Sequence, residues 1–260
     1  DGSIKIERRV IQDSEGNYVH DGAWKQFDRR GTTIAEGQYR NDKRHGTWNR
    51  WYRAGDASLF GQVPYNEFSG PFISQANFRN GKLNGKWTIF DAKQRKISEI
   101  TFVDNQRNGK ATWWFANGRR FQQITYRDGV IDGELLQWNN TPKLVKRDTY
   151  REGRRIAPKV EYFTGSQKKS EGVYLHAKIV VKTPDDWWNA KFAAYTREGK
   201  DEKHGPWTTW HANGQKKQQG EYKNNLPVGN GVWWYENGQK RLQGSFKKGK
   251  KDGRWVWWYE

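Results

Sequence analysis

The 260-residue sequence contains no cysteine, no methionine and only 7 prolines. Without cysteine the chain has no disulfide, no thiolate metal site and no thiol nucleophile. No apolar run approaches the ~20 residues that a membrane-spanning helix requires. The absence of cysteine, and of an initiator methionine before Asp1, slightly favours an extracytoplasmic protein from which a signal peptide has been removed.

Hydrophobic residues are also scarce, at 33%, and the mean hydropathy is −1.17. Aromatic residues nevertheless make up 15% of the chain and include 16 tryptophans, which is not typical of a disordered protein. We therefore expect the apolar surface to be concentrated in large rings rather than in one broad aliphatic core. The 28 glycines predict frequent tight turns.

Acidic residues are outnumbered: 47 Lys and Arg stand against 29 Asp and Glu, which gives a net charge of +18. Such a field attracts anionic lipid, nucleic acid and acidic proteins. It equally keeps a long, exposed protein in solution, and the basic residues are spread along the whole chain. Charge alone leaves both interpretations open.

The chain repeats itself with a period of roughly 24 residues, which is within the range of tandem-repeat proteins. Glycines that we interpret as turn residues stand one period apart or a whole number of periods apart, except for one step of 39 that contains an insertion of 15. These glycines are Gly22, Gly46, Gly85, Gly109, Gly133, Gly205, Gly229 and Gly253. With this glycine as position 0, positions 5 and 17 are aromatic in nearly every unit. Positions 8 and 9 form a second turn, clearest as Asn117-Gly118, Asn213-Gly214 and Asn237-Gly238.

Two turns in each period leave two strands of seven or eight residues, so the sequence predicts an all-β protein. The expected fold is one elongated, twisted antiparallel sheet of about nine or ten hairpins. A two-residue turn at positions 8 and 9 pairs positions whose indices sum to 17. That register sets Trp24 opposite Gly37 and Trp207 opposite Gly220, so that rings cover bare backbone.

The period divides the chain into four regions. Residues 1–20 form an N-terminal cap or partial repeat, and residues 21–156 hold regular repeats with an insertion at about 56–74. Residues 157–204 contain degenerate repeats and an irregular loop, and residues 205–260 hold regular repeats that end in an edge strand. We expect loops to project from the sheet at the insertion and at the irregular segment.

The columns Gly-x-Trp-x-x-Trp, Asn-Gly-x-x and Gly-x-Tyr-x-x-Gly resemble MORN repeats. The segments HGPWTTWHANGQKKQQGEYKNN (His204–Asn225) and GVWWYENGQKRLQGSFKKGKKDG (Gly231–Gly253) carry the resemblance best, and it covers about residues 21–260 apart from the two irregular regions. They are most similar to the bacterial variant known as an antitoxin repeat. The resemblance implies an elongated array of antiparallel hairpins, used for scaffolding, self-association and contact with lipids or proteins.

Residues suited to catalysis or ligand binding are few. The five histidines do not form a converging set, so we expect no metal site. We assign no catalytic residue and find no phosphate-binding loop and no cofactor motif. The irregular segment carries Asp185 and Asp186 beside Trp187 and Trp188. Its plain interpretation is a solvated loop, and its sharper one is a site where the two rings hold a partner or a sugar beside the carboxylates.

Two further sets are candidates for binding. A basic column at the loops between units predicts an edge that contacts an anionic membrane surface or an acidic partner, unless it is merely solvated. Its members are Lys43, Arg44, Lys82, Arg107, Arg154, Arg155, Lys250 and Lys251. The last strand, with Trp255, Trp257 and Tyr259, carries no charge to block pairing and predicts docking on a partner or on a second copy.

The sequence leaves three functions open. The first is a non-enzymatic scaffold or accessory subunit of a larger assembly, with a protein partner or self-association. The second is a basic surface that binds anionic lipid, another polyanion or an acidic protein. Nucleic acid is less favoured, because the tryptophans are committed to packing and few remain for base stacking. The third, which only the tryptophans and Asp185-Asp186 support, is a carbohydrate-active enzyme; a toxin-neutralising role rests on the resemblance alone.

Overall fold

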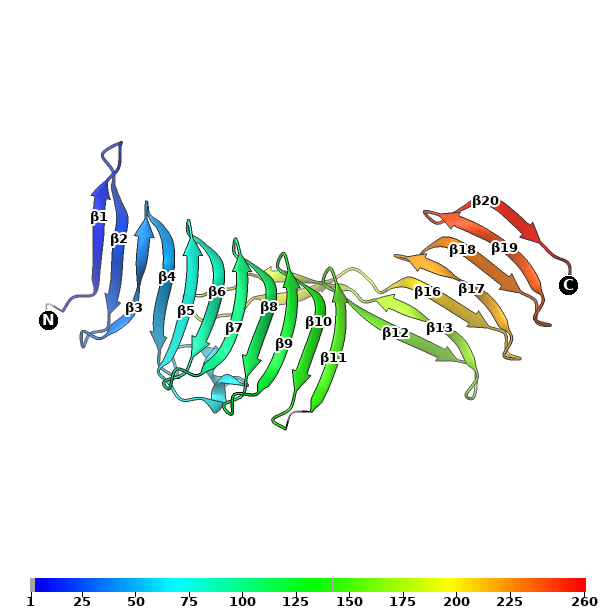
Figure 1. Cartoon of the computed structure of the whole chain (residues 1–260), viewed down its shortest axis with the longest axis horizontal. Helices are drawn as coiled ribbons and strands as arrows, with labels where there is room; N and C mark the ends of the chain where they lie inside the picture. Colours follow the sequence, from blue (N-terminus) through cyan, green and yellow to red (C-terminus); the bar gives the residue numbers. More distant parts are fainter. Residues whose placement is uncertain (1–2, 142) are drawn as a thin grey trace. The chain divides into compact units, whose positions relative to one another are not determined.

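The computed structural model describes residues 3–141 and 143–260, and these contain twenty β-strands and two short 3-10 helices. Eighteen strands belong to antiparallel hairpin ladders, while β14 (Lys178–Thr183) and β15 (Ala194–Glu198) form a separate pair (Figure 1). The predicted all-β class is confirmed. Among the described residues, no helix has the length and apolar character needed to cross a bilayer.

The chain forms two compact units. Unit 1 comprises Asp1–Arg147 and Val180–Thr196, and unit 2 comprises Asp148–Ile179 and Arg197–Glu260. The ladder strands of unit 1 are β1 (Ile6–Gln12), β2 (Tyr18–Phe27), β3 (Thr33–Arg40), β4 (Lys43–Tyr52), β5 (Phe72–Arg79), β6 (Lys82–Phe90), β7 (Lys96–Val103), β8 (Gln106–Trp114), β9 (Arg120–Arg127) and β10 (Val130–Trp138). Strand β11 (Leu144–Arg151) runs across the boundary between the units. The ladder strands of unit 2 are β12 (Arg154–Tyr162), β13 (Lys168–Leu175), β16 (Glu202–Trp210), β17 (Lys216–Lys223), β18 (Leu226–Trp234), β19 (Lys240–Lys247) and β20 (Lys250–Trp257).

The predicted register is present in both units. Trp24 pairs with Gly37 in unit 1, and Trp207 pairs with Gly220 in unit 2. The turn at positions 8 and 9 is one residue longer than predicted, because Gly118 closes a three-residue loop by donating its N–H to the Phe115 carbonyl at 2.9 Å. A bulge in the ladder next to each such turn absorbs the extra residue, so the pairing beyond it keeps the index sum of 17.

The position-0 glycines are not turn residues, and this part of the sequence interpretation is wrong. They lie inside strands at β-bulges, as Gly46 does where β4 shifts its register against β3. Gly46 has φ 68° and Gly205 has φ 71°, a conformation that glycine adopts without a side-chain clash. The turns between successive repeats come four or five residues before the bulge glycine, as at Asn41-Asp42, where both residues have positive φ. Both kinds of site select the same residues, so the sequence could not separate them.

Rings do cover bare glycines, but at Gly37 and Gly172 the ring comes from the following repeat rather than from the partner inside the same hairpin. A Cβ on Gly37 would clash with the Trp48 ring, and a Cβ on Gly172 would clash with the Trp207 ring. The indole Nε1 of Trp48 also donates to the Gln38 carbonyl at 3.0 Å. Trp48 and Trp207 therefore each attach their own repeat to the preceding one.

The turns between repeats connect neighbouring repeats by the same hydrogen bond each time. In each case a turn N–H donates to the carbonyl of the residue two before the preceding bulge glycine. The bonds run from Asp42 to His20, Gly81 to Arg44, Asn105 to Leu83, Gly129 to Arg107, Asn225 to Lys203 and Gly249 to Pro227, at 2.8–3.1 Å. Backbone hydrogen bonds thus repeat with the sequence period.

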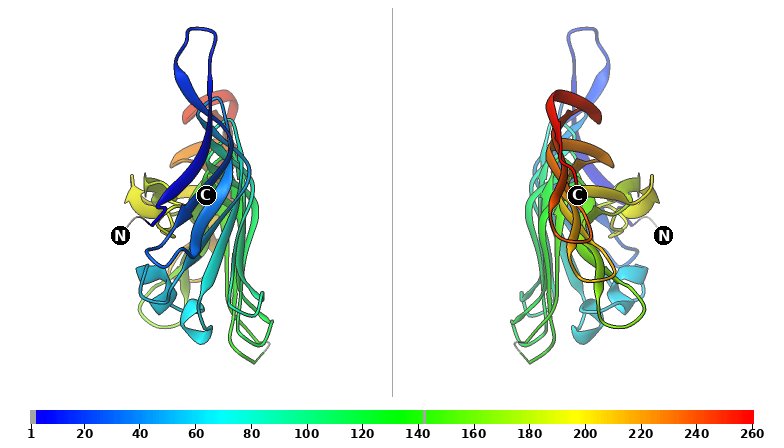
Figure 2. Two further views of the ribbon diagram at one scale, coloured as in Figure 1. Left: turned by 90° about the vertical axis from the view of Figure 1, so that its left-hand side faces the viewer. Right: turned by 90° about the vertical axis from the view of Figure 1, so that its right-hand side faces the viewer.

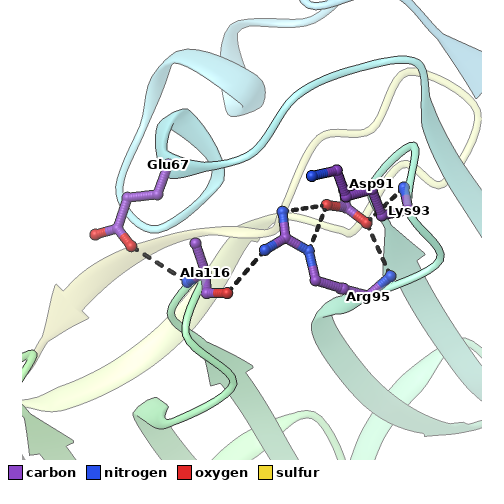
Figure 3. Close-up of polar contacts among 5 residues, drawn as sticks. All are labelled: Glu67, Asp91, Lys93, Arg95 and Ala116. Atoms are coloured by element: carbon purple, nitrogen blue, oxygen red, sulfur yellow. Dashed lines mark hydrogen bonds and ion pairs between the residues drawn. The ribbon is translucent and has the colours of Figure 1, made fainter.

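The insertion does not project as expected, and it ends earlier, because β5 already begins at Phe72. Its helices η1 (Ser58–Gly61) and η2 (Tyr65–Glu67) fold back on the sheet, where the Phe60 ring stacks on Phe72 at 4.1 Å. Figure 3 shows how the insertion is fixed: Glu67 accepts the Ala116 N–H at 3.3 Å, and Arg95 donates to the Ala116 carbonyl at 2.9 Å. Arg95 is itself bound by the buried Asp91 carboxylate at 2.6 and 2.8 Å.

Candidate functional site: the ring face of the sheet

One face of the sheet, which we call the ring face, carries the aromatic columns at positions 2 and 17. Strand alternation places the side chain at position −2, two before the bulge glycine, on the same face. A cation at position −2 lies over the position-2 ring in both units. The pairs are Arg44 over Trp48 (5.0 Å to the ring centroid), Lys203 over Trp207 (4.4 Å) and Lys251 over Trp255 (4.5 Å). The ring face therefore combines apolar surface with positive charge.

In unit 1 the ring face is covered by Val180–Thr196, which we call the strap. The strap belongs to unit 1 although it follows unit 2 residues in the chain. Figure 2 shows the strap and the short helices of the insertion on the same side of the unit 1 strands. The Phe192 ring of the strap meets Tyr65 of the insertion at 6.1 Å and Trp87 of the sheet at 5.3 Å. Strap and insertion together give unit 1 a second layer.

A buried ion pair fastens the strap. The Arg107 guanidinium donates to Asp185 through Nη2 at 2.5 Å and through Nε at 2.9 Å, and the two side chains are 5% and 6% exposed. Burial alone would lower the pKa of Arg107, but the bonds to Asp185 outweigh it and raise that pKa above its usual value. Asp185 also accepts the Ala193 N–H at 2.9 Å, and Arg107 donates to the Tyr126 hydroxyl at 2.9 Å. Both charges are thus satisfied inside unit 1.

The strap tryptophans pack on the part of the ring face around Arg44 and Trp48. Trp187 is 3% exposed and packs edge-on against Phe78 at 5.4 Å and Trp48 at 6.1 Å. Arg44 stands 5.4 Å from the Trp187 ring and 5.2 Å from the Trp188 ring. A cation between aromatic rings is favourable because each ring face carries negative charge density.

The strap backbone is held as well. Tyr52 donates its hydroxyl to the carbonyl of Trp188 at 2.7 Å and lies 3.0 Å from that of Trp187. Burial raises the pKa of Tyr52, so this hydroxyl keeps its proton. An open hollow of about 450 Å³ remains beside the strap, lined by Arg44, Leu83 and the strap residues 183–188.

The candidate partner-binding residues of the irregular segment make contacts with other residues of the same chain. Asp185 and Trp187 are buried against unit 1, while Asp186 accepts from the backbone N–H of Asn189 at 3.1 Å and from its side chain at 2.7 Å. The two neighbouring carboxylates therefore have different partners and do not share a site. Trp188 is half-buried beside Arg50, whose guanidinium lies 3.9 Å from its ring centroid.

The candidate residues of the last strand lie in unit 2. Trp257 is 61% exposed and Tyr259 is 99% exposed, whereas Trp255 is half-buried against Phe246 at 5.0 Å. The Trp255 Nε1 is buried and has no hydrogen-bond acceptor in the part of the chain that the structure describes. Strand β20 pairs with β19, and docking of a partner on β20 stays a prediction.

The predicted basic column divides between the two faces, because neighbouring strand residues point in opposite directions. Arg44, Arg107 and Lys251 contact aromatic rings on the ring face. Lys43, Lys82 and Lys250, at position −3, are exposed. Arg154 binds Glu202 at 2.8 Å, and Arg155 contacts Asp148 at 3.4 Å. Of the eight cations, Arg107 is the one whose charge a buried carboxylate neutralises.

Sequence reasoning missed Lys203 and a ladder of cations on the opposite face. Each cation of this ladder stands at position 11, over an aromatic ring at position 5 of the following regular unit, and also bonds the side chain three residues later. The pairs are Arg120 over Trp138 (5.0 Å), Lys168 over Trp210 (5.8 Å), Lys216 over Trp234 (5.9 Å) and Lys240 over Trp258 (5.9 Å). Aligning positions 5 and 11 would have revealed the ladder.

The arrangement is suited to binding. Residues 3–141 and 143–260 hold no group of three or more side chains able to ligate a metal ion. His20 and His176 each bond a turn aspartate, Asp42 at 2.7 Å and Asp201 at 2.8 Å, as structural turn contacts. The ring face offers cations, indoles and phenols, which recognise carboxylates and aromatic rings.

Comparison with protein families supports the repeat assignment. The model of the MORN repeat matches residues 36–47, 101–119, 219–240 and 243–254, and the model of a MORN repeat variant matches residues 203–224. The matches give no support to the bacterial antitoxin class that the sequence resemblance implied. No curated protein matches the chain. Both units of this hairpin array therefore contain segments that match the MORN repeat.

Proposed function

We propose that this protein is a non-enzymatic scaffold that holds a partner protein on the ring face of its repeat sheet. One observation carries the proposal: in unit 1 the ring face holds a short hairpin segment, the strap, through a buried ion pair and indole contacts. A surface that holds one peptide segment in this way has the chemistry to hold another. Proteins built from MORN repeats generally serve as scaffolds, so the MORN repeat matches of this chain agree with the proposal.

The test is capture of partners on the immobilised full chain from native extract, at about 0.1 M and about 0.5 M salt. Cross-linking followed by mass spectrometry then locates each partner on the chain. A scaffold retains protein partners at the higher salt, because buried contacts are poorly screened, and its cross-links map to ring-face lysines such as Lys203. Capture of nothing but polyanions, released by the higher salt, would count against the proposal.

A second function is favoured by the position-11 ladder and the net charge of +18. In this alternative the opposite face lies against anionic lipid. Cosedimentation with vesicles of phosphatidylserine and phosphatidylcholine would show binding that falls steeply as salt rises. Replacing Lys216 and Lys240 by glutamate should abolish that binding, and unchanged sedimentation of this variant would exclude the ladder as the lipid site.

A further inference from the structure

The strap of unit 1 lies over three consecutive repeat units that carry Arg44, Leu83 and Arg107 at position −2. The order is cation, apolar residue, cation. The first cation stands between the strap tryptophans, and the last binds the strap carboxylate Asp185. The strap turns back on itself here, because Asp186 and Lys191 exchange backbone hydrogen bonds at 2.8 and 2.9 Å. Residues 185–188 at this turn thus satisfy both cations, because a carboxylate and two rings follow one another within four residues.

Unit 2 repeats this order. Its last three repeats carry Lys203, Pro227 and Lys251 at position −2. In both units the outer cations stand on strands four steps apart, which corresponds to about 19 Å across a sheet. Lys203 lies over Trp207 and Tyr222, and Lys251 lies over Trp255 and Trp257. The spacing of charge is therefore the same on both ring faces. The position-2 column differs, since it reads Trp48, Trp87 and Ala111 in unit 1 and Trp207, Gly231 and Trp255 in unit 2.

The two ring faces differ in what covers them. The strap belongs to unit 1, and among the described residues no carboxylate lies within ion-pair distance of Lys203 or Lys251. Most of the buried apolar side chains among the described residues are in unit 1, and those of unit 2 are Tyr150, Leu175 and Trp207.

We propose that the ring face of unit 2 binds a turn-forming peptide segment of a partner protein in which an acidic residue stands two or three positions from a tryptophan or another large aromatic residue. The carboxylate pairs with one of Lys203 and Lys251, and the aromatic ring packs beside the other, as Asp185 and Trp187 do in unit 1. The proposal rests on the scaffold function and names the chemistry of its partner.

The test uses the full chain and a fluorescent peptide that copies residues 183–192, TPDDWWNAKF. Fluorescence anisotropy should show saturable binding. The K203E/K251E variant should bind at least about tenfold more weakly, since each lost charge pair at an interface is worth about 1.4 kcal/mol or more. The K216E/K240E variant has the same net charge and should bind like the parent chain, because its substitutions lie on the opposite face.

Peptide variants complete the design. Replacing both aspartates by asparagine, or both tryptophans by alanine, should each abolish binding, and a peptide with lysine at both aspartate positions should regain binding to K203E/K251E. Equal loss in both lysine variants, or binding that ignores the tryptophans, would overturn the proposal in favour of simple charge attraction. Circular dichroism of both lysine variants establishes that they are folded. If the peptide fails to bind while native partners are still captured, the peptide chemistry is wrong and the scaffold function stands; if both fail, both are wrong.

Discussion

Units 1 and 2 are built from the same repeat, yet they present different surfaces. In unit 1 the cation at position −2 of one repeat, Arg107, is buried under the strap and paired with Asp185. In unit 2 the position −2 cation Lys203 lies over Trp207 without a carboxylate partner among the described residues. The difference teaches that a repeat fixes the register and the ring columns, while a single non-repeating segment decides whether the ring face is an internal core or a free surface.

The largest expected effect comes from breaking the strap pair. Asp185→Ala leaves the Arg107 guanidinium buried and unpaired, so unit 1 should lose about 3–5 kcal/mol of unfolding free energy. Urea unfolding, with hydrogen exchange to assign the loss to unit 1, measures this. The control Asp186→Ala removes a carboxylate whose side-chain hydrogen bonds within residues 3–141 and 143–260 go to Asn189, and it should cost about 1 kcal/mol. Equal costs for the two variants would mean that Arg107 does not depend on the strap.

A smaller effect tests the packing that the two units share. Gly172→Ala places a methyl group against the Trp207 ring and should destabilise unit 2 by about 1–3 kcal/mol. Gly37→Ala meets Trp48 in the same way and should have a similar effect on unit 1. The control is Gly220→Ala, where the nearest atoms of the neighbouring strand lie 3.7 Å away and the cost should stay below about 0.5 kcal/mol. Thermal denaturation of the three variants gives the order, which a costly Gly220→Ala would contradict.

The free cation of unit 2 should contribute little to stability. Lys203→Ala removes the ammonium over Trp207 and Tyr222 and should cost about 0.5–1 kcal/mol, the range for a partly exposed cation over a ring. Chemical denaturation compares it with Asp185→Ala. A loss as large as that of Asp185→Ala would show that Lys203 has a structural role like that of Arg107, and it would remove the contrast between the units.

The smallest effect is a pH response that both units should share. Hydrogen bonds from the His20 backbone and ring lower the pKa of Asp42 below its usual 3.8. For Asp201 burial raises the pKa, but bonds from Ala177 and His176 outweigh it and lower the pKa. A lowered pKa means that the stabilisation is complete above the usual pKa and is lost as the pH falls through the folded-state pKa. NMR titration of the two carboxyls should give values below 3.8 in both units, and an ordinary value for either would exclude that turn contact in solution.

Much of the fold could be predicted because its determinants are local. The pairing of Trp207 with Gly220 follows from a nearby turn, and the error of one residue in the Asn-Gly turn is absorbed by a bulge. The bulge glycines were misread because a bulge and a turn both require positive φ and thus select the same residue. Which ring covers a glycine was also misassigned, because the predicted register considered only the partner strand of the same hairpin. The strand of Gly37 also pairs with β4, and the Trp48 ring comes from that second neighbour.

The candidate site was less predictable because its main contact is not periodic. Arg107 and Asp185 are 78 residues apart, and neither residue type identifies the other as its partner. The sequence singled out Asp185 and Trp187 as unusual, but their composition suits a surface loop as well as a buried strap. Lys203 was missed because its neighbour at position −3 is Glu202, whereas the predicted basic column was recognised mainly by adjacent pairs of cations.

The hydrogen bonds between each turn and the preceding unit have a consequence for how such a protein can change in length. They always join the same two positions of the period, for example Asn225 to Lys203 and Gly249 to Pro227. Loss or duplication of one whole repeat therefore recreates every junction, whereas any other change of length in the strands leaves donors and acceptors mismatched. A chain of this kind grows or shrinks by complete modules, and the distance between its binding positions changes in steps of two strands, about 10 Å.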